Sequence, residues 1–133
     1  MKSILLDTHV WAWFLLRDRL LPVKHLSMIE AAEAVFVSPV SFFEIGQKVR
    51  IGKWPQMEPF INRLPKILDE QYGRVATLSP EISLLAGTLD WSHRDPFDRM
   101  FAATAIHYGL PLISADTAFD ELANYTGWVG RVW

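Results

Sequence analysis

The stretch SILLDTHVWAWFLL, residues 3–16, shows the arrangement on which the fold of the whole chain rests. Its short apolar run at 3–6 is typical of a buried strand, Asp7 follows at once, and a helical pattern covers 8–17. Similar strand-like runs alternate with helical patterns along the rest of the chain. The strand-like runs are 34–37, 74–78, 111–114 and a weaker one at 128–133, and the helical patterns are 22–33, 40–50, 56–71, 80–89, 96–108 and 117–124. Because such an alternation implies right-handed crossovers, the sequence predicts an α/β fold, a three-layer α/β/α sandwich with a central parallel sheet.

The composition is that of a compact folded protein. Half of the 133 residues are hydrophobic and 21% are charged, which excludes a disordered chain and suits a single domain over 1–133. The sequence contains no cysteine, which excludes disulfides and thiolate metal sites. No apolar run approaches the roughly 18 residues of a membrane span, and Asp7 and His9 interrupt the apolar start where a signal peptide would continue. We therefore expect a cytoplasmic protein with no membrane partner.

Acidic residues fall where the predicted strands end. Asp7 directly follows the first strand-like run, and Asp116 follows the fourth. Glu44 lies in the first turns of the helix that leaves the second run, and Asp98 lies in the first turn of the helix that precedes the fourth. Because ligands of open α/β sheets collect outside the carboxyl ends of the strands, we expect these four carboxylates to share one edge of the sheet.

The motif HRDPFDRMFAATA, residues 93–105, begins a helix. Asp95 is a favourable N-cap, Pro96 suits the first helical position, and Asp98 at the third position complements the helix dipole. Gly109 then supplies the left-handed stop. The motif alone predicts a helix start, so a chemical role for Asp98 depends on what lies beside it.

Capping also offers a simpler interpretation of the other acids. Asp7 and Asp116 each precede a helical pattern, and Glu44 completes the capping-box pattern SFFE with Ser41. Serine or threonine would cap as well without mutual repulsion, whereas carboxylates gathered within about 4–6 Å raise one another's pKa or hold a cation. Oxygen ligands in a chain without cysteine suit Mg²⁺ or Mn²⁺. The four acids together suggest metal-assisted phosphodiester hydrolysis, with one ion or two.

Four blocks of the chain resemble one family. The blocks are LLDTHVWAW near the start, SPVSFFEIGQKVRIGKW in the first third, and HRDPFDRMFAATA and LISADTAFDE near the end. In this order and spacing the chain resembles PIN-domain proteins of the VapC type, the ribonuclease toxins of bacterial toxin–antitoxin pairs, from Lys2 to about Glu121. The resemblance implies a five-stranded parallel sheet, an acidic Mg²⁺ or Mn²⁺ site at its carboxyl edge, and cleavage of RNA, often of one tRNA or rRNA loop.

The resemblance also assigns roles to individual residues. The implied catalytic and metal-binding residues are Asp7, Glu44, Asp98 and Asp116. The implied supporting residues are Thr8, Asp95 and Ser114. We expect Asp95 to cap its helix and help to orient Arg99 while Asp98 meets the metal, with these roles exchanged if the helix starts one turn differently. His9 and His93 flank the acids, and we expect them to support the site rather than to act as general acids.

Basic and aromatic residues near these blocks are candidates for RNA contact. The net charge of −2 does not indicate a nucleic-acid partner, but QKVRIGK at 47–53 is a local basic strip, whose simpler interpretation is a solvated helix end. The candidate phosphate contacts are Lys48, Arg50, Arg94 and Arg99. Trp11, Trp13 and Phe14 can stack on bases, although their helical spacing favours the core, with Trp11 or Trp13 the more exposed.

Two apolar segments indicate a partner surface. LPVKHLSMIEAAEA at 21–34 and MEPFINRLPKIL at 57–68 offer more hydrophobic surface than a small domain is expected to bury, unless they pack on each other as a helical pair. In the resembling toxins the partner is an antitoxin, and a homodimer or a larger complex with the antitoxin is usual. The expected partners are therefore an RNA substrate, a cognate antitoxin and a second copy of the chain.

Two other functions stay open. A PIN-like scaffold can bind RNA or protein without cutting, and a housekeeping RNA-processing nuclease would carry the same residues as a toxin. An aspartyl-phosphate phosphotransfer enzyme is disfavoured, because it needs a second acid two residues after the first, where this chain has His9. The main hypothesis is a metal-dependent endoribonuclease that is held inactive by an antitoxin.

Overall fold

Five short apolar runs form one parallel sheet in the computed structural model, which describes residues 2–133. The strands are β1 (Ile4–Leu6), β2 (Val35–Val37), β3 (Arg74–Val75), β4 (Leu112–Ile113) and β5 (Arg131–Val132). They lie in the order β3-β2-β1-β4-β5, and every neighbouring pair is parallel. The predicted α/β fold is confirmed, as is the five-stranded sheet that the resemblance implied, although each strand is shorter than the run that predicted it.

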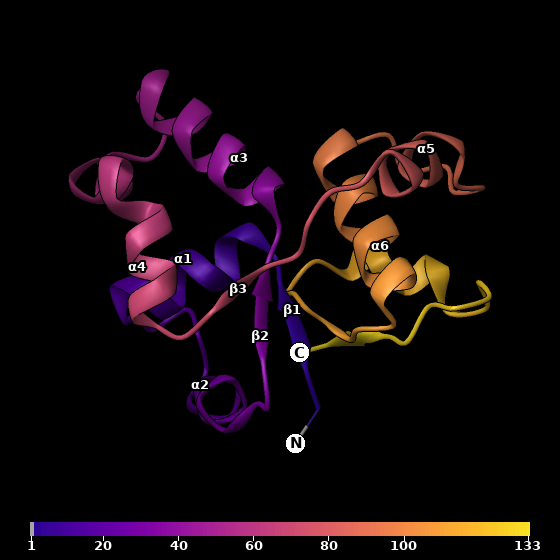
Figure 1. Ribbon diagram of the computed structural model, residues 1–133, viewed down its shortest axis with the longest axis horizontal. Coiled ribbons are helices and arrows are strands. Elements are labelled where there is room, and N and C mark those ends of the chain that lie inside the picture. Colours follow the sequence, from indigo (N-terminus) through magenta and orange to yellow (C-terminus); the bar gives the residue numbers. More distant parts are fainter. Residues whose placement is uncertain (1) are drawn as a thin grey trace.

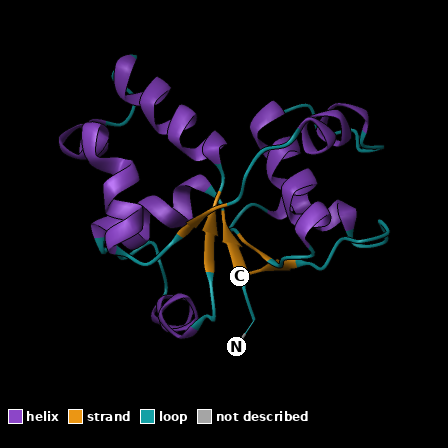
Figure 2. Ribbon diagram, viewed as in Figure 1, coloured by secondary structure: helices purple, strands orange, loops and turns teal. Residues whose placement is uncertain are grey.

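Helices fill the connections between the strands (Figure 2). The α-helices are α1 (Thr8–Leu16), α2 (Val23–Ala31), α3 (Pro39–Arg50), α4 (Leu64–Glu70), α5 (Pro80–Thr88) and α6 (Pro96–Tyr108), and the 3-10 helices are η1 (Pro55–Arg63) and η2 (Thr117–Leu122). The predicted helical pattern at 56–71 is divided into η1, which contains Pro59, and α4, which has Pro65 in its first turn, where a missing N–H is tolerated. The pattern at 117–124 forms only a 3-10 helix. Within 2–133, no helix has both the length and the apolar character that crossing a membrane requires.

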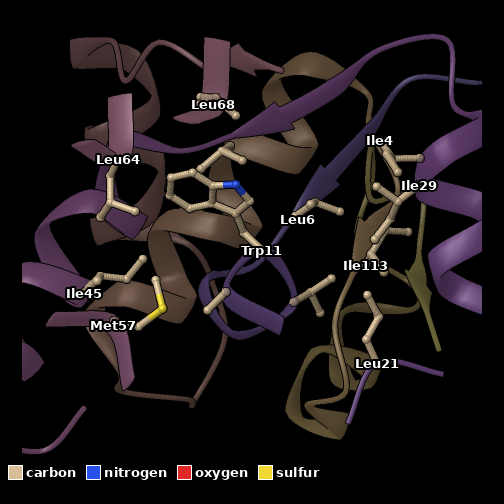
Figure 3. Packing of buried hydrophobic residues seen from close by; sticks show 13 residues of the cluster. Ile4, Leu6, Trp11, Leu21, Ile29, Ile45, Met57, Leu64, Leu68 and Ile113 are labelled. Carbon is tan, nitrogen blue, oxygen red and sulfur yellow. The ribbon is translucent and has the colours of Figure 1, made fainter. Parts of the chain in front are cut away.

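The alternation of side chains along β1 divides the core into two halves. Ile4 and Leu6 belong to a cluster with residues of α1, α2, α3, η1 and α4, whereas Leu5 belongs to a cluster with α6 and η2. Figure 1 shows α1 to α4 on one side of the sheet and α5 and α6 on the other. In the first half, Trp11 of α1 is 1% exposed and lies among aliphatic side chains of β1, α3 and α4 (Figure 3). The two clusters make the three layers that the alternating pattern predicted.

Local caps fix where α3 begins. The Ser38 hydroxyl accepts a hydrogen bond from the Val40 N–H at 3.1 Å, and Pro39 occupies the first helical position. Ser41 therefore lies inside the helix, and the capping box expected from Ser41 and Glu44 is not formed. Glu44 lies one turn further along α3 than a capping box would place it, so its carboxylate does not cap the helix.

Gly73, in the turn between α4 and β3, tests the packing of the first core half. A Cβ at this position would collide with the side chain of Leu68, which is buried in the core. We expect Gly73→Ala to destabilise the protein by about 1–3 kcal/mol, the usual cost of overpacking. Gly87→Ala on the exposed side of α5 meets nothing and should stabilise by up to about 1 kcal/mol. Urea denaturation measures both, and equal stabilities of the two variants would contradict this packing.

Candidate active site

One hollow at the carboxyl edge of the sheet collects the predicted acids. It has a volume of about 430 Å³ and is lined by residues of α1, α3 and α6 and of the turn after β4. Its acidic lining residues are Asp7, Glu44, Asp95, Asp98 and Asp116. The volume lies in the range of pockets that bind small ligands. Four acids predicted from four separate places in the sequence are therefore brought to one hollow.

Asp7 lies at the end of β1 and caps α1. Its Oδ1 accepts a hydrogen bond from the Val10 N–H at 2.9 Å, and its side chain is half-buried. Burial raises the pKa of the Asp7 carboxyl above its usual value, against the lowering effect of the Ser114 hydroxyl and the Val10 N–H, and nearby Glu44 raises it further. A carboxylate held in this way is one whose charge a bound cation would stabilise.

Two buried hydroxyl groups support the acids. Thr8 Oγ1 lies 3.0 Å from Ser41 Oγ and so joins the start of α1 to α3. Ser114 Oγ accepts a hydrogen bond from the Asp116 N–H at 3.1 Å and lies beside the Asp7 carboxyl. Both Thr8 and Ser114 are fully buried. These contacts suit the supporting role that the resemblance implied for them.

Glu44 lies on α3 and is paired with a lysine of the same helix. Glu44 is only 9% exposed, and its Oε2 lies 3.2 Å from Lys48 Nζ. The Lys48 ammonium also lies 5.4 Å from the centre of the Trp54 ring, a cation–π distance. Lys48 therefore contacts both an acid of the hollow and the aromatic ring of Trp54.

In the motif at 93–105, Asp95 caps the helix and Asp98 contacts another side chain. Asp95 is the N-cap of α6, and its Oδ1 accepts hydrogen bonds from the N–H groups of Phe97 at 2.8 Å and Asp98 at 3.2 Å. The Asp98 carboxylate instead contacts His93, with Oδ2 2.7 Å from Nε2. Burial raises the pKa of Asp98 to about 6 in spite of His93, which lowers it. Asp95 is thus the cap of the motif, and Asp98 is the acid that contacts a neighbouring side chain in the hollow.

Asp116 lies at the exposed rim, in the turn that follows β4. Its Oδ1 accepts a hydrogen bond from the Ala118 N–H at 2.9 Å and so caps η2. Asp7 and Asp116 each use one oxygen in a cap, which fixes the carboxylate by a backbone contact and leaves the second oxygen for another ligand. Capping and function are therefore compatible at these two positions.

The donor set suits a hard divalent cation, because carboxylate oxygens are the ligands that Mg²⁺ and Mn²⁺ prefer. Within residues 2–133, however, no three acidic, histidine or cysteine side chains are gathered closely enough to hold a metal ion. Two of the four acids instead contact basic side chains of the protein, Glu44 with Lys48 and Asp98 with His93. A cation bound in the hollow would compete with Lys48 and His93 for these two carboxylates.

The wall of the hollow beside α1 is aromatic. The exposed His9 ring lies 5.8 Å from the ring of Trp13 and 5.0 Å from that of Trp54. Trp13 lines the hollow, whereas Trp11 is buried and its Nε1 donates to Gln71 Oε1 at 2.9 Å. Trp13 is therefore the more exposed of the two candidates for stacking. Sequence patterns do not single out Trp54, whose one signal is its place directly after the basic strip.

The four candidates for phosphate contact lie in different settings. Lys48 lines the hollow, whereas Arg50 and Arg94 are exposed outside its lining. The guanidinium of Arg99 donates to the backbone carbonyls of Ala86, Leu89, Trp91 and His93. Most of the guanidinium N–H groups of Arg99 are therefore engaged inside the protein, which gives this residue a structural role, and a phosphate contact at Arg99 stays a prediction. Those carbonyls, and not the Asp95 carboxylate, orient its side chain.

The two apolar segments at 21–34 and 57–68 bury much of their surface. Ile29 of the first and Met57 of the second lie in the same core cluster, on the sheet face that α1 also covers. Val23, at the start of α2, is 77% exposed. Both segments thus contribute apolar side chains to the same half of the core, and a partner surface on them stays a prediction.

The raised pKa of Asp98 makes the stability of the metal-free protein depend on pH. Folded Asp98 keeps its proton up to about pH 6, whereas the unfolded chain releases it near the ordinary value of 3.8. Between these values the folded state binds more protons, so this residue lowers stability as the pH rises. We expect Asp98→Asn, which cannot ionise, to gain stability relative to the wild-type protein from about pH 4 to about pH 6. Urea denaturation in EDTA measures the difference, and a difference that does not change with pH would contradict it.

Comparisons with known proteins find relatives along nearly the whole chain. The PIN domain family model matches residues 4–125. A curated relative, Ribonuclease VapC22 of Mycobacterium tuberculosis (strain ATCC 25618 / H37Rv), is 28% identical over 117 residues, which are 87% of this chain and 88% of that protein. The solved structure of VapBC2 from Rickettsia felis, bound to a DNA fragment from its promoter, has a TM-score of 0.67 at 15% identity and covers 100% of this chain and 99% of its own. A toxin–antitoxin complex from Klebsiella pneumoniae has a TM-score of 0.63 at 17% identity, with 98% and 97% covered.

Proposed function

The chain belongs to the PIN-domain family, and from this premise we propose that it is a Mg²⁺- or Mn²⁺-dependent endoribonuclease that acts as the toxin of a toxin–antitoxin pair. The observation that carries the proposal is the gathering of Asp7, Glu44, Asp98 and Asp116 around one hollow. Burial raises the pKa of Asp7 and Asp98, so folding holds these acids where their charge is unfavourable, as functional sites often do. The relative that is named a ribonuclease supports the class of reaction.

The same four acids are the residues that would hold the cation. Bound there, a divalent cation supplies an activated water and stabilises the charge that develops on the phosphodiester. The chain contributes rigidity, since helix caps fix Asp7 and Asp116 and the His93 contact orients Asp98. Asp7 and Asp116 are thus held in place by their backbone contacts before the substrate arrives.

Cleavage of total cellular RNA by the purified protein tests the activity. The protein, free of any antitoxin, is incubated with Mg²⁺ or Mn²⁺ and, in parallel, with EDTA. We expect discrete RNA products only where the metal is present, and their return when excess metal is added back. RNA that stays intact with demonstrably folded protein and added metal would instead favour the binding module without catalysis.

We further propose a cognate antitoxin as the partner, with assembly into a homodimer or a larger complex with that antitoxin, in the cytoplasm where the RNA substrate lies. The support is the likeness in fold to a toxin–antitoxin complex. A small protein encoded beside this chain should co-purify with it and suppress RNA cleavage. A nuclease that acts without such a neighbour would favour housekeeping RNA processing.

A further inference from the structure

A second hollow adjoins the acidic one and differs from it in character. It has a volume of about 440 Å³ and shares the lining residues His9, Trp13 and Lys48 with the acidic hollow, so the two lie side by side. Lys53 and Trp54 line its other side. We call this second hollow, defined by these five residues, the side groove.

The side groove presents aromatic rings next to the acids. His9 is exposed, and its ring lies 5.0 Å from that of Trp54 at an angle of 31° and 5.8 Å from that of Trp13 at 49°. Trp13 and Trp54 are both half-buried, so their partly exposed rings are braced by the core cluster against which they pack. Rings that are fixed in this way form a stacking platform for unpaired bases, since every base has a π-face.

The charged residues that line the side groove are mainly basic, whereas the neighbouring hollow is acidic. Five carboxylates line the acidic hollow, whereas the side groove is lined by one, Asp18, whose Oδ1 accepts from the Leu20 N–H at 2.9 Å. Lys48 stands at the junction of the two hollows, and the exposed Lys53 lies beyond it. An RNA backbone whose scissile phosphate lies at the acids would place its next phosphates near these two lysines. The positive charge of the lysines is complementary to those phosphates.

We propose that the side groove binds the nucleotide of a single-stranded RNA next to the scissile phosphate, with the base on His9 and Trp54 and the adjoining phosphate on Lys48 and Lys53. The inference rests on the proposed ribonuclease function and adds the residues of this chain that would hold the neighbouring nucleotide. In duplex RNA the bases are stacked on one another, so only an unpaired strand can offer a base to these rings. Trp54 and Lys53 thus select single strands without reading their sequence.

Binding of a fluorescently labelled eight-nucleotide single-stranded RNA, followed by anisotropy in EDTA so that the RNA stays intact, tests this inference. We expect Trp54→Ala to weaken binding by about 5- to 100-fold and Trp54→Phe, which keeps a ring, to weaken it much less. Lys53→Ala should reduce the salt dependence of binding by about one counterion. Lys66→Ala, an exposed lysine of α4 away from both hollows, is the matched control and should bind as the wild-type protein does.

Two further measurements make the inference falsifiable even if Trp54→Ala unfolds. His9→Ala removes an exposed ring and should also weaken binding, and a duplex of the same length should bind more weakly than the single strand. Wild-type affinity in both His9→Ala and Lys53→Ala, or equal affinity for duplex and single strand, would overturn the inference. So would a loss of binding in Phe43→Ala without a loss in the side-groove variants, because Phe43 lines a separate apolar groove between α3 and α6.

The ribonuclease proposal fails by a different result. If the wild-type protein binds the single strand through the side groove but no metal-dependent cleavage occurs, the catalytic proposal fails while the RNA groove stands. If cleavage occurs and the side-groove variants change neither KM nor affinity, the groove fails while the nuclease stands. Where both hold, Lys53→Ala should raise KM and leave kcat nearly unchanged, because it removes binding that substrate and transition state share.

Discussion

Replacing Asp7 or Asp98 by asparagine is expected to lower metal-dependent RNA cleavage by about 10²–10³-fold, the usual loss when one preorganised electrostatic group is removed from an active site. Both carboxylates line the acidic hollow, and burial raises the pKa of both. An amide keeps the shape of the side chain and removes the charge that would hold a cation. Asp116→Asn should cost less, because Asp116 lies at the exposed rim.

These variants separate a functional role from a capping role. Asparagine caps a helix about as well as aspartate, so Asp7→Asn should keep the contact to the Val10 N–H and the start of α1. Thermal melting and titration with Mn²⁺ are measured beside RNA cleavage, with Asp69→Asn on the exposed side of α4 as the control. A folded Asp7→Asn variant that cleaves RNA at the wild-type rate would make Asp7 a cap alone.

The order of elements could be predicted because its signals are local. Apolar runs bounded by an acid, or by serine followed by proline, mark the end of a strand and the start of a helix. Asp95 caps α6 as predicted, and Ser38 and Ser79, each followed by a proline, cap α3 and α5. The convergence of the acids followed from topology alone, because parallel strands end at one edge.

What the sequence could not supply are contacts between distant segments. The order of the strands, β3-β2-β1-β4-β5, depends on which crossovers pass over which face. The contact between His93 and Asp98 and the placement of Trp54 beside His9 depend on loops whose paths no periodicity records. At Ser41 a local pattern was misleading. The sequence predicted that Ser41 caps α3, whereas the helix begins earlier, with Ser38 as its cap and Pro39 in its first turn.

Replacing Arg99 by alanine is expected to destabilise the protein by about 3–5 kcal/mol, because a charged donor group that serves several carbonyls is lost and those carbonyls are left without it. The half-buried guanidinium donates to Ala86, Leu89, Trp91 and His93, and so ties the end of α5 and the following loop to the first turn of α6. Thermal melting should show a fall in Tm of roughly 10–20 °C. Lysine should not restore the Tm, because its single ammonium cannot reproduce the planar fork.

Arg94, five residues earlier in the chain, provides the matched control. Arg94 is exposed, so Arg94→Ala should melt within about 0.5 kcal/mol of the wild-type protein. The loop that Arg99 holds carries His93, and His93 contacts Asp98, so the Arg99→Ala variant should also lose RNA cleavage at temperatures where it is still folded. If Arg99→Ala instead melts like the wild-type protein and loses only RNA affinity, Arg99 is a phosphate contact after all, and the four carbonyl contacts do not contribute to stability. A large fall in Tm would show that Arg99 holds the loop before α6 in place. That loop carries His93, which contacts Asp98, so Arg99 would connect the start of the helix to the acid in the hollow.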